Sequence, residues 1–256
     1  MALQGGLLGA SALVLWGSVD SNEIDEPALN DWWTNEHLPE RLSIPGFLRA
    51  RRYYSRQNDR DITDYLTLYE TADLTVLTSA AYMQKLNNPT QGTQQHIPTL
   101  ATMSRSACSV ELSLRRSELH TCSATMGVTM AMVVFSTTSD SNQAQHVCDS
   151  ARHAFDSVVT QNKSLMAVHL LREDAAATEP GSASQSYANV KLKRNASIGV
   201  SKWICLWEFS SPNHSPFLNA HAALKDYKDE VSLSVLESAA IGVRTYSILC
   251  SANDWM

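Results

Sequence analysis

One histidine stands out by its neighbours in the stretch WWTNEHLPERLSIPGF, which runs from residue 32 to residue 47. His37 lies beside Glu36, three residues before Glu40 and one helical turn after Trp33. An imidazole that titrates near neutrality suits proton transfer to and from carbon or oxygen. We therefore expect His37 to be a catalytic acid or base, with Glu36 or Glu40 orienting its ring. The simpler alternative is a histidine that only caps the end of a helix.

Pro39 predicts where the helix that carries His37 should end. A proline disfavours helical geometry in the preceding residue and cannot donate to the carbonyl four residues earlier. The amphipathic stretch 27–42 should therefore break near His37 and continue as a short second turn. The negative end of a helix dipole favours the charged imidazole, whereas burial beside Trp33 would act in the opposite direction.

Aromatic side chains form the second class of candidates, because alternate members of predicted strands could line a pocket for a flat, apolar ligand. For each of them, ordinary core packing is the alternative. The expected substrate-binding residues are Trp16, Trp33, Tyr53, Tyr69 and His96.

Two similar pairs of residues support the strand assignments. Tyr69 precedes Glu70 in LTLYET, and Trp207 precedes Glu208 in ICLWEF. Side chains alternate along a strand, so the aromatic ring and the carboxylate of each pair must face opposite sides of the sheet.

Metal and cofactor sites are not indicated by the remaining motifs. His96 falls in an inserted stretch, 88–100, and no histidine belongs to an H-x-x-x-H or H-E-x-x-H pair. The sequence has neither a glycine-rich phosphate loop nor a G-x-S-x-G elbow. We expect no metal and no organic cofactor.

The order of predicted elements occurs twice. Strand, helix, strand, strand, helix and strand are predicted at 11–19, 27–42, 46–56, 64–71, 74–88 and 105–116, and again at 127–137, 141–162, 165–173, 201–210, 215–231 and 240–251. This order is typical of a ferredoxin-like unit, whose sheet is covered by helices on one face only. We expect two tandem units, 1–118 and 119–256, with insertions at 88–100 and 174–199.

Composition narrows the classes of partner. The net charge of −6 offers no basic surplus for a nucleic acid. The five scattered cysteines contain no C-x-x-C pair, which favours a reducing compartment. The apolar start of the chain lacks a basic region before it, and no stretch is long enough to cross a bilayer. We expect a cytoplasmic protein with a small-molecule substrate, no nucleic-acid or membrane partner, and a homodimer as an open possibility.

The stretch DWWTNEHLPERLSIPGFLRARRYY (31–54), followed by YLTLYE, resembles the dimeric α+β barrel superfamily, particularly EthD-like proteins. The resemblance covers residues 10–116; residues 125–250 match by pattern only, as a divergent second copy. It implies an α+β fold in which two ferredoxin-like sheets pack together as a barrel within one chain. It also implies activity on aromatic or polyketide-like small molecules, in many members without a cofactor and in some with haem.

The preferred interpretation is a cofactor-independent lyase or isomerase, of cyclase or decarboxylase type, acting on an aromatic or polyketide-derived molecule of secondary metabolism. The alternatives are a monooxygenase of the same fold, cofactor-free or haem-dependent, and a non-catalytic small-molecule-binding protein. Only the first half carries the His-Leu-Pro motif, so we expect one principal site.

Overall fold

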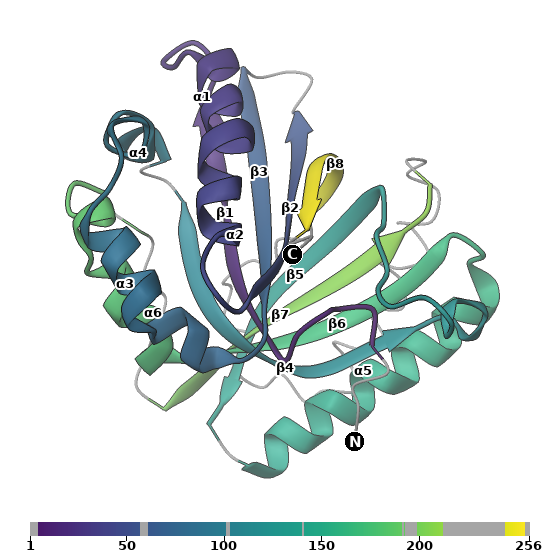
Figure 1. Cartoon of the computed structure of the whole chain (residues 1–256). Coiled ribbons are helices and arrows are strands. Elements are labelled where there is room, and N and C mark those ends of the chain that lie inside the picture. The colour runs from purple at the N-terminus through teal and green to yellow at the C-terminus, as the bar shows by residue number, and fades with distance from the viewer. Residues whose placement is uncertain are drawn as a thin grey trace. The chain divides into compact units, whose positions relative to one another are not determined.

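Antiparallel strands and covering helices make up the chain, whose fold is α+β (Figure 1). The structure is a computed structural model, and it describes residues 5–56, 61–100, 103–139, 141–190, 192, 199–211 and 244–253. The chain divides into two units, which are described separately below. The α1 unit comprises Leu8–Ser109, Asp174–Asn195 and Ile248–Met256, and the α5 unit comprises Met1–Leu7, Val110–Glu173 and Ala196–Ser247.

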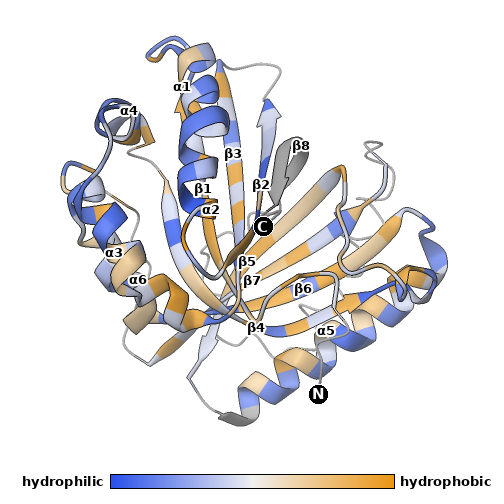
Figure 2. Cartoon of the chain, viewed as in Figure 1, coloured by the Kyte–Doolittle hydropathy of each residue, from blue (hydrophilic) through white to orange (hydrophobic). Residues whose placement is uncertain are grey.

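The sheet of the α1 unit has the strand order β4–β1–β3–β2, with antiparallel neighbours. Its strands are β1 (Ser11–Asp20), β2 (Phe47–Arg56), β3 (Ile62–Thr71) and the first half of β4 (Ser104–Arg115). Hydropathy varies along these strands as residues alternate between the two faces (Figure 2). Both faces of β3 are nonetheless buried from Thr63 to Thr71.

Helices cover one face of this sheet. They are α1 (Glu26–Trp32), a π-helical turn (Trp33–His37), α2 (Leu38–Leu42), α3 (Ala80–Asn87), α4 (Gln91–His96) and α6 (Ala175–Ser182). Several begin at a side-chain cap: Asp25 accepts from the Ala28 amide, and Ser79 accepts from the Tyr82 amide. Short 3-10 turns lie at Leu74–Thr78, Ile97–Leu100 and Gln185–Tyr187. The helices and the sheet enclose one core that contains Leu13, Trp33, Tyr69, Tyr82 and Leu86.

The sheet of the α5 unit has the strand order β8–β5–β7–β6, again with antiparallel neighbours. Its strands are β5 (Thr129–Thr138), β6 (Leu165–Glu173), β7 (Val200–Phe209) and the start of β8 (Arg244–Asn253). One long helix, α5 (Ser141–Gln161), packs on this sheet through Val147, Ala151, Phe155 and Val158. A 3-10 turn lies at Ser117–Leu119.

The two units share a detail of strand pairing. The register of β2 with β3 shifts between Phe47 and Arg49, so that Arg49 pairs with Glu70. The register of β6 with β7 shifts in the same way between Leu165 and Ala167, so that Ala167 pairs with Glu208. The similarity between LTLYET and ICLWEF therefore extends to the bulge that faces each glutamate.

The expected break near His37 is confirmed in part: a short second helix begins at Leu38, but the backbone between the two helices stays helical. Helical backbone continues to Leu42, because the π turn at 33–37 takes up the proline. The Leu38 amide donates to the Trp33 carbonyl five residues earlier. Pro39 then lies in the first turn of α2, where its missing N–H leaves no bond unmade.

Both insertions contain helix where loops were expected. The stretch 88–100 contains α4, which begins at a cap from Thr90 to the Thr93 amide. The stretch 174–199 contains α6, which begins at a cap from Asp174 to the Ala177 amide in an alanine-rich sequence. The helix expected at 215–231 lies outside the described residues.

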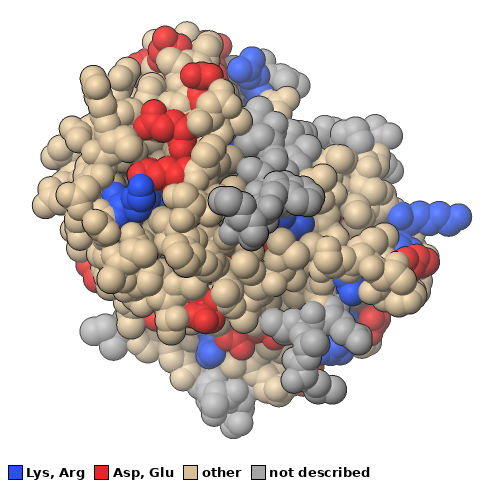
Figure 3. All heavy atoms as spheres, viewed as in Figure 1, with Lys and Arg blue, Asp and Glu red and all other residues tan. Residues whose placement is uncertain are grey.

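Acidic side chains gather on the molecular face over α1 (Figure 3). The exposed ones in this region include Glu23, Asp25, Asp31 and Glu36. A face of this charge does not suit a phosphate backbone. Within the described part of the chain, no helix combines the length and the apolar character that a membrane crossing requires.

Candidate active site

The π turn directs His37 into the core of the α1 unit. Trp33 and His37 lie at its two ends and are both buried, with exposed fractions of 1% and 5%. The residues between them turn outward: Asn35 and Glu36 are exposed and Thr34 is half-buried. Trp33 and His37 are four residues apart and lie on the same side of the turn, while the polar side chains between them stay outside.

The imidazole of His37 is packed among aromatic and charged groups. Its ring centroid lies 4.7 Å from that of Trp32, and its Nδ1 atom lies 4.0 Å from Glu40 Oε2. Among the described residues, Nδ1 has no hydrogen-bond partner. His37 therefore presents a buried ring nitrogen that is available to a ligand.

Burial lowers the pKa of His37 well below its usual value of 6.5, and the charges of Arg41 and Arg52 lower it further. The helix-end dipole that was expected to favour the charged ring is absent, because the helix continues beyond His37. His37 is therefore a neutral imidazole near pH 7, which is the form that accepts a proton.

The two neighbouring glutamates have different surroundings. Glu36 is exposed and accepts a hydrogen bond from Thr90 Oγ1 at 2.6 Å, facing α4. Glu40 lies beside the His37 ring and also contacts Arg41 at 3.7 Å and Lys85 at 4.0 Å. Of the two predicted orienting acids, the structure brings only Glu40 to the imidazole.

Trp32 links the two candidate histidines of this unit. His37 lies 4.7 Å from the Trp32 ring, and His96 stacks on it at 5.2 Å and an interplanar angle of 22°. Gly92 permits this contact, because a Cβ atom there would lie 2.5 Å from Trp32 Cδ1. His96 therefore lies near His37 through Trp32, a residue that the sequence analysis did not select.

The sheet separates the predicted aromatic residues into two groups. Tyr69 belongs to the same helix-covered core as Trp33. Trp16 pairs with Leu66, and Tyr53 pairs with Leu66 from the other side, so both project from the opposite face. Tyr53 accepts a hydrogen bond from Arg51 there. Trp16 and Tyr53 are therefore not beside His37.

The predicted alternation of ring and carboxylate is confirmed. Tyr69 and Trp207 each lie in a helix-covered core. Glu70 and Glu208 are fully buried on the other face of their own sheets.

A second set of ring contacts lies beside the π turn. Arg52 stacks over Trp33 with its Cζ atom 4.4 Å from the ring centroid, and donates to Thr34 Oγ1 and Asn30 Oδ1 at 2.9 and 2.8 Å. Tyr65 lies 6.0 Å from Trp33 and donates to Glu26 Oε1 at 2.5 Å. Burial and the bond to Glu26 raise the pKa of Tyr65, so it remains a neutral phenol.

Two arginines and three tyrosines, called the Arg–Tyr cluster, extend the polar surroundings of His37. Its members are Arg41, Tyr69, Tyr82, Arg105 and Tyr187, and all five are buried. Arg41 lies 5.8 Å from the Tyr82 ring centroid, and Arg105 lies 5.8 Å from that of Tyr187. Arg105 also donates to Tyr82 Oη at 3.0 Å and to the Thr178 carbonyl at 2.8 Å.

Only Tyr69 of this cluster was predicted as a site residue. Burial raises the pKa of Tyr69, while the Trp33 indole and the Arg41 charge act against that increase. The arginines gave no signal, because a buried arginine cannot be distinguished from a surface one in a single sequence.

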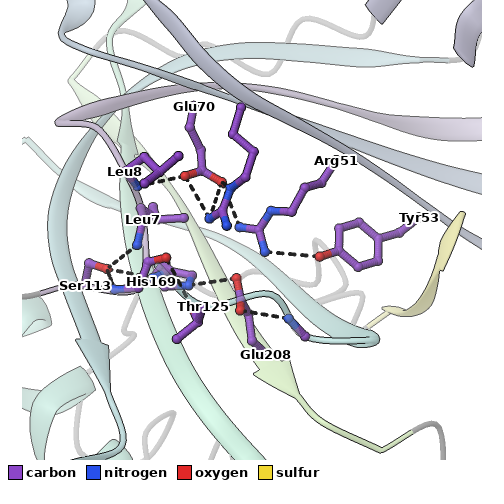
Figure 4. Close-up of polar contacts among 12 residues, drawn as sticks. Leu7, Leu8, Arg51, Tyr53, Glu70, Ser113, Thr125, His169 and Glu208 are labelled. Atoms are coloured by element: carbon purple, nitrogen blue, oxygen red, sulfur yellow. Dashed lines mark hydrogen bonds and ion pairs between the residues drawn. The ribbon is translucent and has the colours of Figure 1, made fainter. Parts of the chain in front are cut away.

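Each sheet also carries a buried polar cluster on its other face (Figure 4). In the α1 unit, Arg49 donates to both carboxylate oxygens of Glu70 at 2.7 and 2.9 Å, and Arg51 lies 3.0 Å from Glu70. The Leu8 amide donates to the same carboxylate at 2.8 Å. Glu70 is thus held by two guanidinium groups and a backbone amide.

The corresponding cluster of the α5 unit is centred on His169. Its Nδ1 lies 2.8 Å from Ser113 Oγ, and its Nε2 lies 3.1 Å from Glu208 Oε1. Ser113 Oγ already accepts from the Gly6 amide at 3.0 Å, so its proton is available for Nδ1. This pattern assigns the proton of His169 to Nε2, which donates to Glu208.

A metal site does not appear among the described residues, where no three histidine, cysteine or acidic side chains come together as possible ligands. Among the described histidines, His169 offers no ring nitrogen to a haem iron. Both ring nitrogens of His169 are hydrogen-bonded.

Comparison with known proteins gives the fold. No family model matches the sequence, and no curated protein matches it. A provisionally assigned monooxygenase from Fusobacterium nucleatum subsp. nucleatum matches the structure with a TM-score of 0.50 at 10% identity, over 96% of this chain and 95% of that one. An anthrone oxidase-like protein matches with a TM-score of 0.52 at 10% identity, over 96% and 94%. The chain therefore shares the α+β fold of these two structures over almost its whole length.

Proposed function

We propose that this protein is a cofactor-independent monooxygenase that oxidises a fused-ring phenolic compound with molecular oxygen. The observation that carries the proposal is His37, a neutral buried imidazole whose Nδ1 atom has no partner among the described residues. The names of the two structural neighbours, a monooxygenase and an anthrone oxidase-like protein, support oxygenation over the lyase or isomerase reaction preferred from sequence.

The chemistry requires a base and a stabilised carbanion. An anthrone has an acidic methylene group between two aromatic rings and opposite a ketone. Transfer of one methylene proton to His37 leaves a carbanion delocalised as a phenolate, which the neighbouring charge of Arg41 stabilises. Arg41 is already protonated, so it acts through its charge and accepts no proton in this step.

Oxygen then reacts with the electron-rich carbon. The carbanion electron pair forms the new C–O bond, and the resulting peroxide takes the proton back from His37. Loss of the second proton from the same carbon breaks the O–O bond and releases water, so the methylene group and one molecule of oxygen give a ketone and one molecule of water. One oxygen atom enters the product and the other enters water, as a monooxygenase requires.

The surroundings of His37 suit such a substrate. Trp32, Trp33 and Tyr69 provide aromatic surface in the same core, and Glu40 lies 4.0 Å from the ring that must be oriented. Glu36 and His96 lie toward α4, where Glu36 bonds to Thr90 and His96 stacks on Trp32. Trp16 and Tyr53 lie on the other face of the sheet.

Oxidation of 1,8-dihydroxyanthrone under isotopically labelled oxygen gas tests the proposal. We expect the quinone to gain one labelled oxygen, and the rate above spontaneous oxidation to fall by about 10²-fold or more in His37→Gln, as for loss of a general base. The exposed His153→Gln is the matched control and should retain the rate. A His37→Gln variant with undiminished turnover would refute the role of His37.

Two other results of the same assay would indicate a different function. Product formation under nitrogen, without oxygen uptake, would indicate the lyase or isomerase. Ligand binding without turnover of any anthrone would indicate a binding protein.

The finer features of the fold are part of the same proposal. We propose that the units are divergent ferredoxin-like copies whose sheets pack together as an intrachain barrel, with a boundary near residue 118 and an EthD-like first copy. The equivalent bulges at Arg49 and Ala167 support the duplication. A cytoplasmic location, a role in secondary metabolism and a homodimer also remain proposals.

A further inference from the structure

We infer that the Arg–Tyr cluster is an oxyanion subsite, which holds an ionised hydroxyl group of the aromatic substrate beside His37. The inference rests on the proposed function, because it names the chemical group by which the substrate of that site is recognised.

The first observation is an excess of buried positive charge. Arg41 and Arg105 are 2% and 3% exposed. Arg105 donates to neutral oxygens, among them the Thr178 carbonyl and the Tyr82 hydroxyl. Burying a charge without an opposite charge is costly, so an anion would stabilise this core.

The carboxylate of Glu40 pairs only weakly with the Arg41 guanidinium group. The distance from Arg41 Nη2 to Glu40 Oε2 is 3.7 Å, which is longer than a hydrogen bond. The same carboxylate is shared with Lys85 and with His37, both at 4.0 Å. Glu40 therefore does not compensate Arg41 fully.

The second observation is a group of unused donors in one core. Arg41 Nη1 and Arg105 Nε are buried without a hydrogen-bond partner among the residues that the structure describes. Tyr69 Oη faces the Trp33 indole, which can only donate, so the Tyr69 hydroxyl proton is also unused there. Unmade bonds of buried donors are destabilising, and an oxygen with several lone pairs would satisfy them. A phenolate oxygen has both the charge and the lone pairs.

The neighbouring groups favour an aromatic anion over a small inorganic one. The Arg41 charge acts on Tyr69, on Tyr187 and on His37, so the cationic group lies near both tyrosines and the imidazole. A fused-ring phenol bound there would place its oxyanion at Arg41 and its rings among the aromatic side chains of the same core.

A pair of matched probes tests the inference without turnover. 2-Hydroxyanthraquinone can ionise and changes colour when it does, whereas 2-methoxyanthraquinone has almost the same shape and cannot ionise. Titration of the bound hydroxy compound by absorbance should give a pKa about one unit or more below that of the free compound, which is a tenfold shift in its acid constant. The methoxy compound should bind at least about tenfold more weakly at a pH where the hydroxy compound is ionised.

The sign of the shift is decisive. Burial in an apolar core without cations would raise the pKa of the probe, so a lowered value requires positive charge at the hydroxyl. A raised or unchanged pKa, or equal binding of the two compounds, would overturn the inference.

Variants of Arg41 test whether the Arg–Tyr cluster causes the shift in the pKa of the bound hydroxy compound. Arg41→Met should abolish the shift, and Arg41→Lys should retain part of it. Arg56→Met is the matched control in the same unit, because the Arg56 side chain is 65% exposed, and it should behave as the wild type. An unchanged shift in Arg41→Met would also overturn the inference.

Thermal unfolding separates a ligand-binding arginine from a structural one. Arg41→Met should unfold at the wild-type temperature or above it, because the substitution removes a poorly compensated buried charge. If this variant does not fold, Tyr69→Phe removes only a hydroxyl. It should weaken binding of the hydroxy compound by about threefold and leave the methoxy compound unaffected.

Failure of the subsite and failure of the proposed oxidation give different results. His37→Gln should bind the hydroxy compound with the wild-type shift but should not oxidise an anthrone. A normal shift in a protein that never consumes oxygen would leave the subsite standing and remove the oxygenase. His37-dependent turnover with no shift would remove the subsite alone.

Discussion

Arg51 and His169 stand at corresponding positions of β2 and β6, each two residues beyond the residue that pairs with a buried glutamate on the neighbouring strand. Arg51 lies 3.0 Å from Glu70, and His169 Nε2 lies 3.1 Å from Glu208. The same place in the two sheets is thus occupied by a permanent cation in one unit and by an imidazole in the other.

This difference predicts that replacing Glu70 and replacing Glu208 by glutamine will lower the free energy of unfolding by unequal amounts. Glu70→Gln would leave two buried guanidinium groups facing a neutral amide, and should cost about 3–5 kcal/mol of unfolding free energy. Glu208→Gln should cost only about 1 kcal/mol, because His169 Nε2 can donate to an amide oxygen as well as to a carboxylate. Urea denaturation of the two variants measures both values, and similar losses would contradict the assigned tautomer of His169.

The lowered pKa of His37 predicts a pH-dependent stability. The unfolded chain takes up a proton on His37 as the pH falls below 6.5, whereas the folded protein keeps the ring neutral to a lower pH. Stability from this residue is therefore present above pH 6.5 and is lost on acidification.

The measurement compares urea midpoints about one pH unit above and one below the usual imidazole pKa. His37→Gln should lose less stability between these values than the wild type, since glutamine does not titrate. His153→Gln removes an exposed histidine and should follow the wild type. A wild-type pH response in His37→Gln would show that the imidazole is not held neutral.

The π turn predicts that the length of this segment matters more than its composition. Deleting Asn35 should convert the turn to α-helix and rotate one end by about 100° relative to the other. The buried side chains of α1 and those of α2 could then not all keep their places in the core, and the loss should be at least about 3 kcal/mol, the cost of removing a buried aromatic side chain.

Asn35→Ala is the control for the deletion. It keeps the length and loses only a side-chain bond to Asp31 on the exposed surface. It should change the unfolding temperature little, and a deletion variant as stable as this control would contradict the role of the extra residue.

Much of the sheet could be predicted because strand signals are local. Alternating residues gave the strands and the opposite orientation of Tyr69 and Glu70, which depends only on the period of two. The presence of Trp16 and Tyr53 on the other face could not be predicted with the same ease, because it depends on the register between strands.

The surroundings of His37 were predicted in part. Its burial beside tryptophan follows from the amphipathic pattern, but the rule that proline ends a helix did not predict the π turn that keeps the backbone helical. That rule considers the bond to the fourth preceding carbonyl and not a turn of five. Trp32, Arg41 and Arg105 were missed, because contacts among α2, α4 and β4 join residues far apart in the chain.

The five-residue turn also affects how this chain is compared with others. A π turn adds one residue to a helix without lengthening the element by a full turn, so it shifts the numbering of every later residue on that helix. A relative with a plain α-helix here should align with a gap of one position between Trp33 and His37. Without that gap, His37 would be aligned with the residue that corresponds to Leu38.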